Sequence, residues 1–251
     1  MDELTKIMQR IQKSIHSTSQ NSSGTEKYEC PICKDLEWII DEKTNTARPC
    51  KCREVKAYKR ILKSSGISEA FRRKSFDNFK INNPLTAQAK KMAINYVRYF
   101  SRIKDQRNNS IAFLGQVGAG KTHLSIAIAN ELMKQNVGVL YMQYREAITH
   151  LKQNMLDEEY YQKEMCKYKT ASVLLIDDLY KGKITDSDLN IMFEIINYRY
   201  LKQLPIIVSS EYTVDKLLNF DEAIGSRIIE MCKKHIIEFH GQELNYRING
   251  R

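Results

Sequence analysis

The sequence lacks the features of membrane-spanning and exported proteins. No run of apolar residues approaches the ~20 that a transmembrane helix needs. Residues 1–20 are polar and charged, without the apolar core or the small-residue cleavage site of a signal peptide. There is also no internal repeat, and the only low-complexity stretch is residues 17–25. These absences favour a globular, cytoplasmic protein with no membrane partner.

The chain is long enough for more than one folded unit. Its 251 residues exceed what a single hydrophobic core of roughly 100–200 residues usually serves. Residues 17–25 have the composition of a flexible linker and follow a short amphipathic helix predicted for residues 2–15. That helix packs on its own domain or docks a partner, and the sequence favours neither.

Three segments are predicted from these composition shifts. They are an N-terminal helix and metal-binding module (1–62), a connector (63–84) and a large domain (85–251). Basic residues exceed acidic ones, 40 against 30, which gives a net charge of +10 at pH 7. Such an excess attracts polyanions over long range. A solvated basic surface explains the same charge.

From residue 85 onward, apolar strands alternate with helical patterns. Helices are predicted for residues 85–103, 121–135, 145–168 and 186–202. Strands are predicted for residues 111–114, 137–142, 172–176 and 205–209. Because alternation of this kind builds a parallel sheet covered on both faces, we predict an α/β fold with a parallel central sheet.

The segment Gly115-Gln116-Val117-Gly118-Ala119-Gly120-Lys121-Thr122 fits the phosphate-binding pattern G-x-x-x-x-G-K-[ST], between a predicted strand and a helix. Its glycines let backbone N–H groups curl around phosphate oxygens at the positive end of the helix. Lys121 brings charge to the β and γ phosphates, and the hydroxyl of Thr122 is a ligand for Mg²⁺. The predicted ATP contacts are Gly115, Gly118, Ala119, Gly120, Lys121, Thr122 and His123.

An acidic pair supplies the second half of this predicted site. The apolar run 173–176 ends in Asp177 and Asp178, where ligands bind in parallel sheets. We predict that Asp177 holds Mg²⁺ through water and that Asp178 orients the attacking water as the base. The next strand ends in Ser210 and Glu211, either of which could contact the γ-phosphate, although strand-end capping explains each equally well. The two motifs together predict ATP hydrolysis.

Four cysteines are spaced as a metal site, in one C-x₂-C pair and one C-x-C pair. They are Cys30, Cys33, Cys50 and Cys52. Four thiolates in a short cytosolic stretch are the ligand set of a structural Zn²⁺ site, and so small a module would depend on the metal for folding free energy. Redox chemistry is the alternative, but the segment lacks the βαβ context that it needs. The other two cysteines are predicted to be buried thiols: Cys166 and Cys232.

The order of these features resembles the DnaC/DnaI-type replicative helicase loaders, in the versions of phages and low-GC Gram-positive bacteria. The resemblance covers nearly the whole chain. It rests on the cysteine module, the ATPase motifs, and three segments: Gly66-Ile67-Ser68-Glu69-Ala70-Phe71-Arg72, Ser75-Phe76-Asp77-Asn78-Phe79 and Asp221-Glu222-Ala223-Ile224-Gly225-Ser226-Arg227-Ile228.

The resemblance implies an AAA+ fold in which two arginines contact ATP. Arg227 would be an arginine finger that reaches the ATP of a neighbouring subunit. Arg247 would be a second sensor arginine that contacts the γ-phosphate within its own subunit. A permanently charged guanidinium suits developing phosphoryl charge. Relatives often carry Asn at the first sensor, where this chain has Ser210-Glu211. The usual AAA+ acidic pair is Asp-Glu, whereas the Asp-Asp pair of this chain is common in the loader family and implies slow hydrolysis used as a switch.

The resemblance also implies function and partners. The protein would be an ATP-dependent loader that binds a DnaB-type helicase through its N-terminal module and delivers it onto single-stranded DNA. It would form a homo-oligomer when ATP or the helicase is bound. Single-stranded DNA would lie near residues 144–152, where an ordinary helix face explains the sequence equally well. Aromatic and basic groups there are Tyr141, Tyr144, Arg145 and Lys152.

Two alternatives stay open. The first is a transposition helper ATPase of the IstB kind, which would act on duplex DNA and a transposase. The cysteine module argues against it, because those relatives usually begin differently. The second is a nucleotide-dependent helicase adaptor that scarcely hydrolyses ATP, and the arginine finger would distinguish it from a loader.

Overall fold

The computed structural model describes residues 28–41, 46–53, 56–57, 60, 63, 65–241 and 244–249 of the chain. Two compact units are present, Met1–Ala57 and Tyr58–Arg251. The helix predicted for residues 2–15 and the linker predicted for residues 17–25 lie outside the described residues. Within those that are described, no helix has the length and apolar character needed to cross a membrane.

The first unit contains an antiparallel hairpin and the cysteine cluster. The strands are β1 (Trp38–Asp41) and β2 (Thr46–Pro49), with Trp38 opposite Pro49. Its buried cluster consists of three cysteines, with Ile39 and Cys52 packed against it. So small an apolar core contributes little hydrophobic stabilisation, and a metal ion held by the four sulfur atoms would add to it.

The second unit is built on a five-stranded parallel sheet with strand order β4-β5-β6-β3-β7. The strands are β3 (Ile111–Gly115), β4 (Val139–Gln143), β5 (Val173–Leu179), β6 (Ile206–Ser210) and β7 (Ile236–Phe239). This arrangement confirms the predicted α/β class with a parallel central sheet. The carboxyl ends of β3, β5 and β6 meet at one edge, where parallel sheets bind their ligands.

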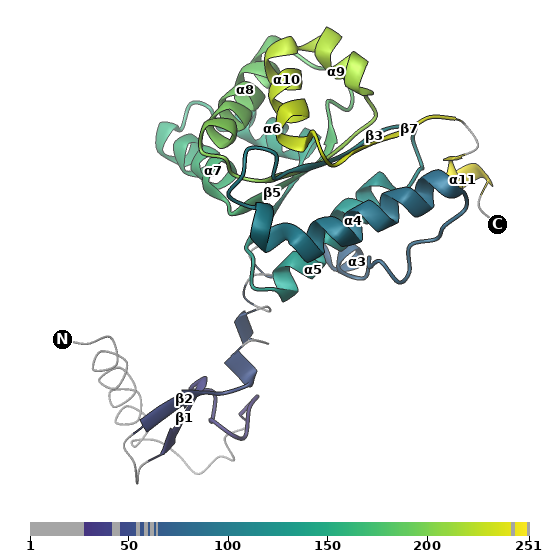
Figure 1. Ribbon diagram of the computed structural model, residues 1–251. Coiled ribbons are helices and arrows are strands. Elements are labelled where there is room, and N and C mark those ends of the chain that lie inside the picture. The colour runs from purple at the N-terminus through teal and green to yellow at the C-terminus, as the bar shows by residue number, and fades with distance from the viewer. Residues whose placement is uncertain are drawn as a thin grey trace. The chain divides into compact units, whose positions relative to one another are not determined.

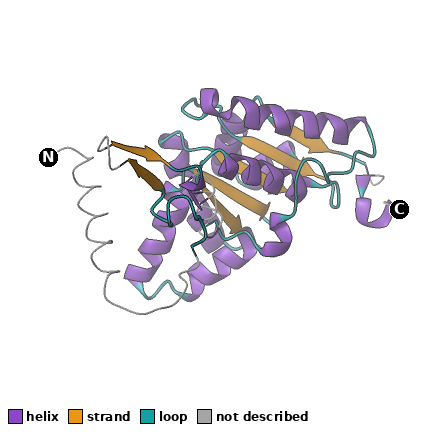
Figure 2. Cartoon of the chain, turned by 90° about the horizontal axis from the view of Figure 1, so that it is seen from below, coloured by secondary structure: helices purple, strands orange, loops and turns teal. Residues whose placement is uncertain are grey.

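Helices cover both faces of the sheet, as Figures 1 and 2 show. One face packs against α3 (Glu69–Arg72), α4 (Pro84–Ile103) and α5 (Lys121–Lys134). The other packs against α6 (Tyr144–Gln153), α7 (Glu158–Thr170), α8 (Asp186–Leu201), α9 (Val214–Phe220) and α10 (Glu222–Cys232). The short α11 (Tyr246–Asn249) follows β7. Side chains along β5 point alternately to the two faces of the sheet. Leu175 packs in the core beneath α4 and α5, whereas Leu174 and Ile176 pack in the core on the opposite face.

The single helix predicted for residues 145–168 is two helices, and this prediction is corrected. The helix α6 ends at Gln153, and α7 begins after Asp157, whose carboxylate accepts a hydrogen bond from the backbone N–H of Tyr160 at 3.0 Å. An Asp side chain that caps a helix start competes with continued helix, which explains the break. The elements α9, α10, β7 and α11 were not predicted from the pattern of apolar residues.

A buried arginine locks α7 onto the sheet. The Arg199 side chain is fully buried, and its guanidinium donates hydrogen bonds to the carbonyl oxygens of Tyr168, Lys169, Ala171 and Pro205. The last carbonyls of a helix carry partial negative charge, so the cation caps the α7 end. This anchor holds α7 and α8 together at the edge of the sheet where β5 and β6 begin.

The connector predicted for residues 63–84 packs along the larger unit. The backbone N–H of Tyr141 donates to the carbonyl oxygen of Ser65 at 2.7 Å, which extends the edge of β4. Ile67 and Phe79 are buried in the core on the α5 side. The connector therefore contributes a wall to the larger unit.

Candidate functional site

The phosphate-binding loop has the geometry that its sequence predicts. It joins β3, which ends at Gly115, to α5, which begins at Lys121. Gly120 precedes the helix with a φ of 88°, in the left-handed region that favours glycine. A Cβ atom at Gly120 would lie 2.6 Å from Cε2 of Phe79, so only glycine lets the connector approach the loop this closely.

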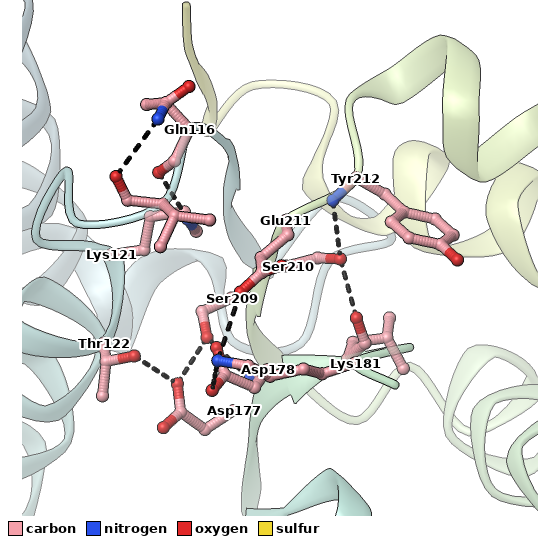
Figure 3. Close-up of polar contacts among 12 residues, drawn as sticks. Gln116, Lys121, Thr122, Asp177, Asp178, Lys181, Ser209, Ser210, Glu211 and Tyr212 are labelled. Atoms are coloured by element: carbon pink, nitrogen blue, oxygen red, sulfur yellow. Dashed lines mark hydrogen bonds and ion pairs between the residues drawn. The ribbon is translucent and has the colours of Figure 1, made fainter. Parts of the chain in front are cut away.

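Lys121 lies inside the loop that it serves. Its side chain is buried, and its Nζ atom donates to the carbonyl oxygen of Gln116 at 2.7 Å (Figure 3). The same Nζ atom donates to the carbonyl oxygen of Gly115 at 2.8 Å. Burial lowers the pKa of Lys121 to about 8, and the nearby carboxylates of Glu211 and Asp178 oppose this shift. An ammonium group so placed is poorly hydrated and faces the position where phosphates bind in such loops.

Asp177 and Thr122, the two predicted Mg²⁺ ligands, are in direct contact. The Thr122 hydroxyl donates to Oδ1 of Asp177 at 2.8 Å, and the Ser209 hydroxyl donates to the same oxygen. The hydroxyl of Tyr141 donates to Oδ2 at 3.0 Å. Burial raises the pKa of Asp177, while the hydrogen bonds from Ser209 and Thr122 oppose the rise. A carboxylate and a hydroxyl oxygen side by side fit the hard-oxygen preference of Mg²⁺.

Asp178 is displaced from the strand that carries it. A register irregularity between Ile176 and Leu179 interrupts the pairing of β5 with β6, and Asp178 has a φ of 55°. Its backbone N–H donates to the Ser209 hydroxyl at 3.0 Å. Non-glycine residues in this region carry strain that is common at functional sites. Side chains of consecutive strand residues normally project to opposite faces. Because of the displacement, the carboxylates of Asp177 and Asp178 nevertheless line the same pocket.

A lysine neutralises Asp178 in this arrangement. The Nζ atom of Lys181 lies 2.8 Å from Oδ2 of Asp178 and 3.1 Å from Oε1 of Glu211 (Figure 3). Both carboxylates line the pocket that contains the phosphate-binding loop. Sequence reasoning missed Lys181, because only the turn after β5 brings it back onto Asp178.

One pocket of about 440 Å³ unites these groups, within the ~300–1,000 Å³ usual for ligand sites. The loop and the acidic pair form one side. The connector supplies Phe71 and Phe79, and α11 supplies Tyr246, over whose ring the Lys80 ammonium lies at 5.6 Å. The predicted contacts that line this pocket are Gly118, Ala119, Gly120, Lys121, Thr122, His123, Asp177 and Asp178.

His123 faces the connector. Its Nε2 atom lies 2.9 Å from the carbonyl oxygen of Ser75 and 2.9 Å from Oδ1 of Asn78, and its ring packs edge-on against Phe79. Burial lowers the pKa of His123. A neutral imidazole here joins the connector to the start of α5 at the border of the pocket.

Ser210, predicted as a nucleotide contact, points to the other face of β6. Its hydroxyl donates to the carbonyl oxygen of Leu179 at 2.8 Å and accepts from the N–H of Tyr212 at 3.1 Å. Ser209 is the residue that contacts the acidic pair. Side chains of consecutive strand residues project to opposite faces, so the register of β6 decides between the two serines. The alternation along the strand was the signal that could have identified Ser209.

Arg227 lies on α10, away from the pocket-lining residues of its own chain. Its Nε atom donates to Oδ1 of Asn197 at 3.1 Å, and the guanidinium lies over the rings of Phe193 and Tyr200, 5.1 Å and 5.5 Å from the centroids. The side chain therefore rests on the outer face of α8. The side chain of Arg247 lies outside the described residues, while its backbone belongs to α11.

Two aromatic residues of the segment where the resemblance places single-stranded DNA make contacts within the protein. Tyr144 is buried, and its ring packs edge-on against Tyr180, so it offers no face for base stacking. The hydroxyl of Tyr141 is bonded to Asp177. Arg145 and Lys152 line a second pocket of about 410 Å³ beside α6.

The four cysteines of the first unit converge as predicted. Their sulfur atoms all lie within 4.8 Å of one another, with Cys30 Sγ 3.8 Å from Cys50 Sγ and Cys33 Sγ 3.3 Å from Cys52 Sγ. Tetrahedral Zn²⁺ with Zn–S bonds of about 2.3 Å places its sulfur ligands about 3.8 Å apart, so the donor set fits this ion.

Two cysteines of the cluster have pKa values shifted in opposite directions. Hydrogen bonds from the backbone N–H groups of Cys33 and Ile32 lower the pKa of Cys30 to about 7, which favours the thiolate that binds metal, whereas burial and the neighbouring cysteines raise the pKa of Cys52. Of the remaining cysteines, Cys232 is buried as predicted, but Cys166 is exposed and that prediction was wrong. Cys166 lies on α7, where only Met165 is buried.

Comparison with known proteins gives a family and a fold. The family described as "IstB-like ATP binding protein" matches residues 8–248. The chain is 37% identical over 262 residues to "Phage-like element PBSX protein XkdC" of Bacillus subtilis (strain 168), covering 100% of this chain and 97% of the relative. It is 23% identical over 197 residues to "Replicative helicase loader DnaI" of the same organism, covering 78% of this chain and 57% of DnaI. A crystal structure of the DnaC helicase loader superimposes with a TM-score of 0.58 and 19% identity, covering 69% of this chain and 100% of that chain, which shows a shared fold.

Proposed function

Because the chain belongs to the family of IstB-like ATP binding proteins, we propose that it is an ATPase that binds a replicative DNA helicase and delivers it onto single-stranded DNA. The observation that carries the proposal is one pocket containing Lys121, Thr122, Asp177 and Asp178, in a fold shared with the DnaC helicase loader. The four-cysteine unit precedes the ATPase, in the order of features on which the resemblance to loaders rests.

The pocket residues divide the work of ATP hydrolysis among them. Lys121 and the loop N–H groups bind the phosphates. Thr122 and Asp177 would hold Mg²⁺, which neutralises charge on the β and γ phosphates when bound. Asp178 orients the attacking water and accepts its proton. The Lys181 contact occupies one oxygen of Asp178, which is consistent with slow hydrolysis.

We infer that a second copy of the chain completes the ATP site. Arg227 lies outside the pocket of its own chain and rests half-buried on α8. Supplied by a neighbouring copy, its guanidinium would stabilise the charge that develops on the γ-phosphate. ATP would then be hydrolysed only when copies of the chain assemble, which is the behaviour that a loading switch needs.

Arg227→Ala should therefore keep ATP binding and lose the turnover that depends on protein concentration. A missing arginine finger costs roughly 100-fold or more in hydrolysis. Steady-state ATPase assays across a wide range of protein concentrations measure this, with Arg98→Ala as the matched control, because Arg98 is an exposed arginine on α4. Unchanged turnover of Arg227→Ala at high concentration would rule out the finger.

The helicase partner can be tested by affinity capture. Tagged protein is incubated with host lysate, with and without ATP, and bound proteins are identified by mass spectrometry. We expect recovery of the replicative helicase, and we expect the purified pair to place the helicase on a single-stranded circle. Failure to recover the helicase in either condition would contradict the loader.

A transposition helper ATPase of the IstB kind is a second candidate, because the family that matches this chain is described as IstB-like ATP binding protein. Such a helper would bind duplex DNA in an ATP-dependent way and would ignore the helicase. Gel-shift assays that compare duplex and single-stranded oligonucleotides distinguish the two. A helicase adaptor that scarcely hydrolyses ATP would show capture without measurable turnover.

A further inference from the structure

We propose that Tyr141 is a positioning residue of the ATP site, whose hydroxyl fixes the Asp177 carboxylate for Mg²⁺ and thereby sets how much Mg²⁺ the protein needs to bind ATP. The Tyr141 hydroxyl donates to Oδ2 of Asp177 at 3.0 Å. Because Asp177 is the carboxylate that would hold Mg²⁺ in the proposed function, this role of Tyr141 rests on that function. It adds a residue that lies outside both the phosphate-binding loop and the acidic pair.

The pairing of β4 with β5 brings Tyr141 to the face of the sheet that Asp177 occupies. In the register of these parallel strands, Tyr141 pairs with Leu175, and Gln143 pairs with Asp177. Residues two apart on a strand share a face, so Tyr141, Leu175 and Asp177 lie on the same side of the sheet. The tyrosine side chain is long enough to reach Asp177 from the neighbouring pair, and it lines the ATP pocket.

The Asp177 carboxylate is only 4% exposed, and three hydroxyl groups bond its two oxygens. Thr122 and Ser209 both donate to Oδ1, whereas Tyr141 donates to Oδ2. Among the described residues, Tyr141 is the only hydrogen-bond donor to Oδ2. An ionised carboxylate only accepts hydrogen bonds, and a buried oxygen without a donor is costly. Donors on both oxygens, from different elements of the fold, therefore fix the plane of the carboxylate.

The connector holds the Tyr141 ring in place. Phe71 packs edge-on against that ring, with the centroids 6.1 Å apart and the planes at 79°. The backbone N–H of Tyr141 is bonded to the carbonyl oxygen of Ser65 at 2.7 Å. A ring that is already fixed by packing loses little further freedom when its hydroxyl bonds Asp177. The connector thereby helps to order the Mg²⁺ carboxylate through Tyr141, in addition to forming a wall of the pocket.

Tyr141→Phe isolates the contribution of this one hydroxyl. The variant keeps the ring that packs against Phe71 and removes only the donor to Asp177. Loss of a hydrogen-bond partner of a metal-binding carboxylate typically costs about 10–100-fold in metal affinity. We therefore expect the Mg²⁺ concentration that half-saturates nucleotide binding to rise about tenfold. At saturating Mg²⁺ the variant should reach the nucleotide affinity of the parent.

Binding of a fluorescent, non-hydrolysable ATP analogue to the full-length protein measures this requirement without turnover. The analogue is titrated over a series of Mg²⁺ concentrations and without Mg²⁺, in buffer cleared of divalent cations by a resin, so that no chelator touches the cysteine unit. Without Mg²⁺ we expect Tyr141→Phe to bind the analogue as the parent does, because the hydroxyl acts through Asp177. An equal Mg²⁺ requirement in the two proteins overturns the proposal. An equal loss of affinity with and without Mg²⁺ also overturns it, since Tyr141 would then act on the nucleotide or on the fold.

Tyr161→Phe is the matched control, because Tyr161 is a partly buried tyrosine on α7 that packs on the opposite face of the sheet and does not line the ATP pocket. It should bind the analogue as the parent does at every Mg²⁺ concentration. Thermal unfolding of both variants recognises a loss of fold. The same shift in Tyr161→Phe as in Tyr141→Phe would overturn the specific role of Tyr141.

Asp177→Asn separates this proposal from the proposed function. If that variant keeps the Mg²⁺ dependence of the parent, the role of Asp177 fails and the role of Tyr141 fails with it. If Asp177→Asn loses the dependence while Tyr141→Phe matches the parent, the ATP site stands and the positioning role alone is overturned. Added to Asp177→Asn, the Tyr141→Phe change should have no further effect on the Mg²⁺ requirement, because both act through one carboxylate.

Discussion

Lys121→Ala is expected to bring ATP hydrolysis to background and to weaken ATP binding by roughly 100-fold. The parent ammonium is buried inside the loop, where it is bonded to the carbonyl oxygens of Gly115 and Gln116. A charged hydrogen-bond donor in such a position contributes about 1.5–3 kcal/mol to binding of its partner, and each 1.4 kcal/mol is tenfold in affinity. Isothermal titration with MgATP and a coupled ATPase assay measure the two effects.

Lys134→Ala is the matched control, because Lys134 is on the same helix, near its far end, with its side chain 54% exposed. We expect it to bind and hydrolyse ATP as the parent does. Both variants are compared by thermal unfolding, so that a loss of fold is recognised. Near-normal turnover in Lys121→Ala would contradict the assignment of the ATP site.

The pH dependence of ATP binding gives an independent measurement on the same residue. Burial lowers the pKa of Lys121 to about 8, so the ammonium is present below that pH and is lost above it. ATP affinity should therefore fall between about pH 7 and pH 9, and binding above pH 8 should take up a proton as the phosphates restore the charge. Lys121→Ala should show no such dependence. An affinity of the parent that is flat over this range would contradict a buried ammonium at the phosphates.

Replacing Cys30 and Cys33 with serine is expected to remove one bound zinc ion per chain and to unfold the first unit. The four sulfur atoms lie within 4.8 Å of one another, and two of the ligands would be lost. Structural zinc supplies ~10–16 kcal/mol of apparent binding free energy in small metal-dependent modules, so the hairpin β1–β2 should not survive its loss. Helicase capture should fail, while ATP binding by the second unit persists.

Metal analysis of the purified protein measures the zinc content, and cobalt substitution reports tetrahedral thiolate ligands by its visible absorption. Cys166→Ser is the control, since Cys166 is an exposed cysteine outside the cluster. It should retain a full equivalent of zinc. A parent protein that contains no metal when purified without chelators would end the zinc assignment.

Several features of the candidate site were predictable because they are local in sequence. The spacing of Gly115, Gly120 and Lys121 specifies a strand, a curled loop and a helix start within a few residues. An apolar strand that ends in Asp177 places that carboxylate at the ligand-binding edge of any parallel sheet. Short spacings within each cysteine pair likewise limit how far apart the two sulfur atoms of that pair can lie. The β1–β2 hairpin, which lies between the two pairs in the sequence, brings one pair to the other.

Other features depend on how distant segments meet. Ser209 rather than Ser210 contacts Asp177, because the pairing of β6 with β5 sets which face each serine occupies. Tyr144, for which base stacking and an ordinary helix face were equally good explanations, packs into the core, since α6 turns that ring toward Tyr180. Helical periodicity identifies an amphipathic face without saying what it packs against.

By itself, the sequence determined the phosphate-binding loop, the acidic pair and the four-cysteine set, because each follows from residue types at characteristic spacings. It also determined the α/β class, through the alternation of apolar strands with helical patterns. Only the tertiary structure decided that the connector walls the ATP pocket, that Arg227 rests on α8, and that Lys181 is paired with Asp178. The physical reason is that strand register, the left-handed backbone at Asp178 and the close approach at Gly120 arise from contacts between segments far apart in the chain.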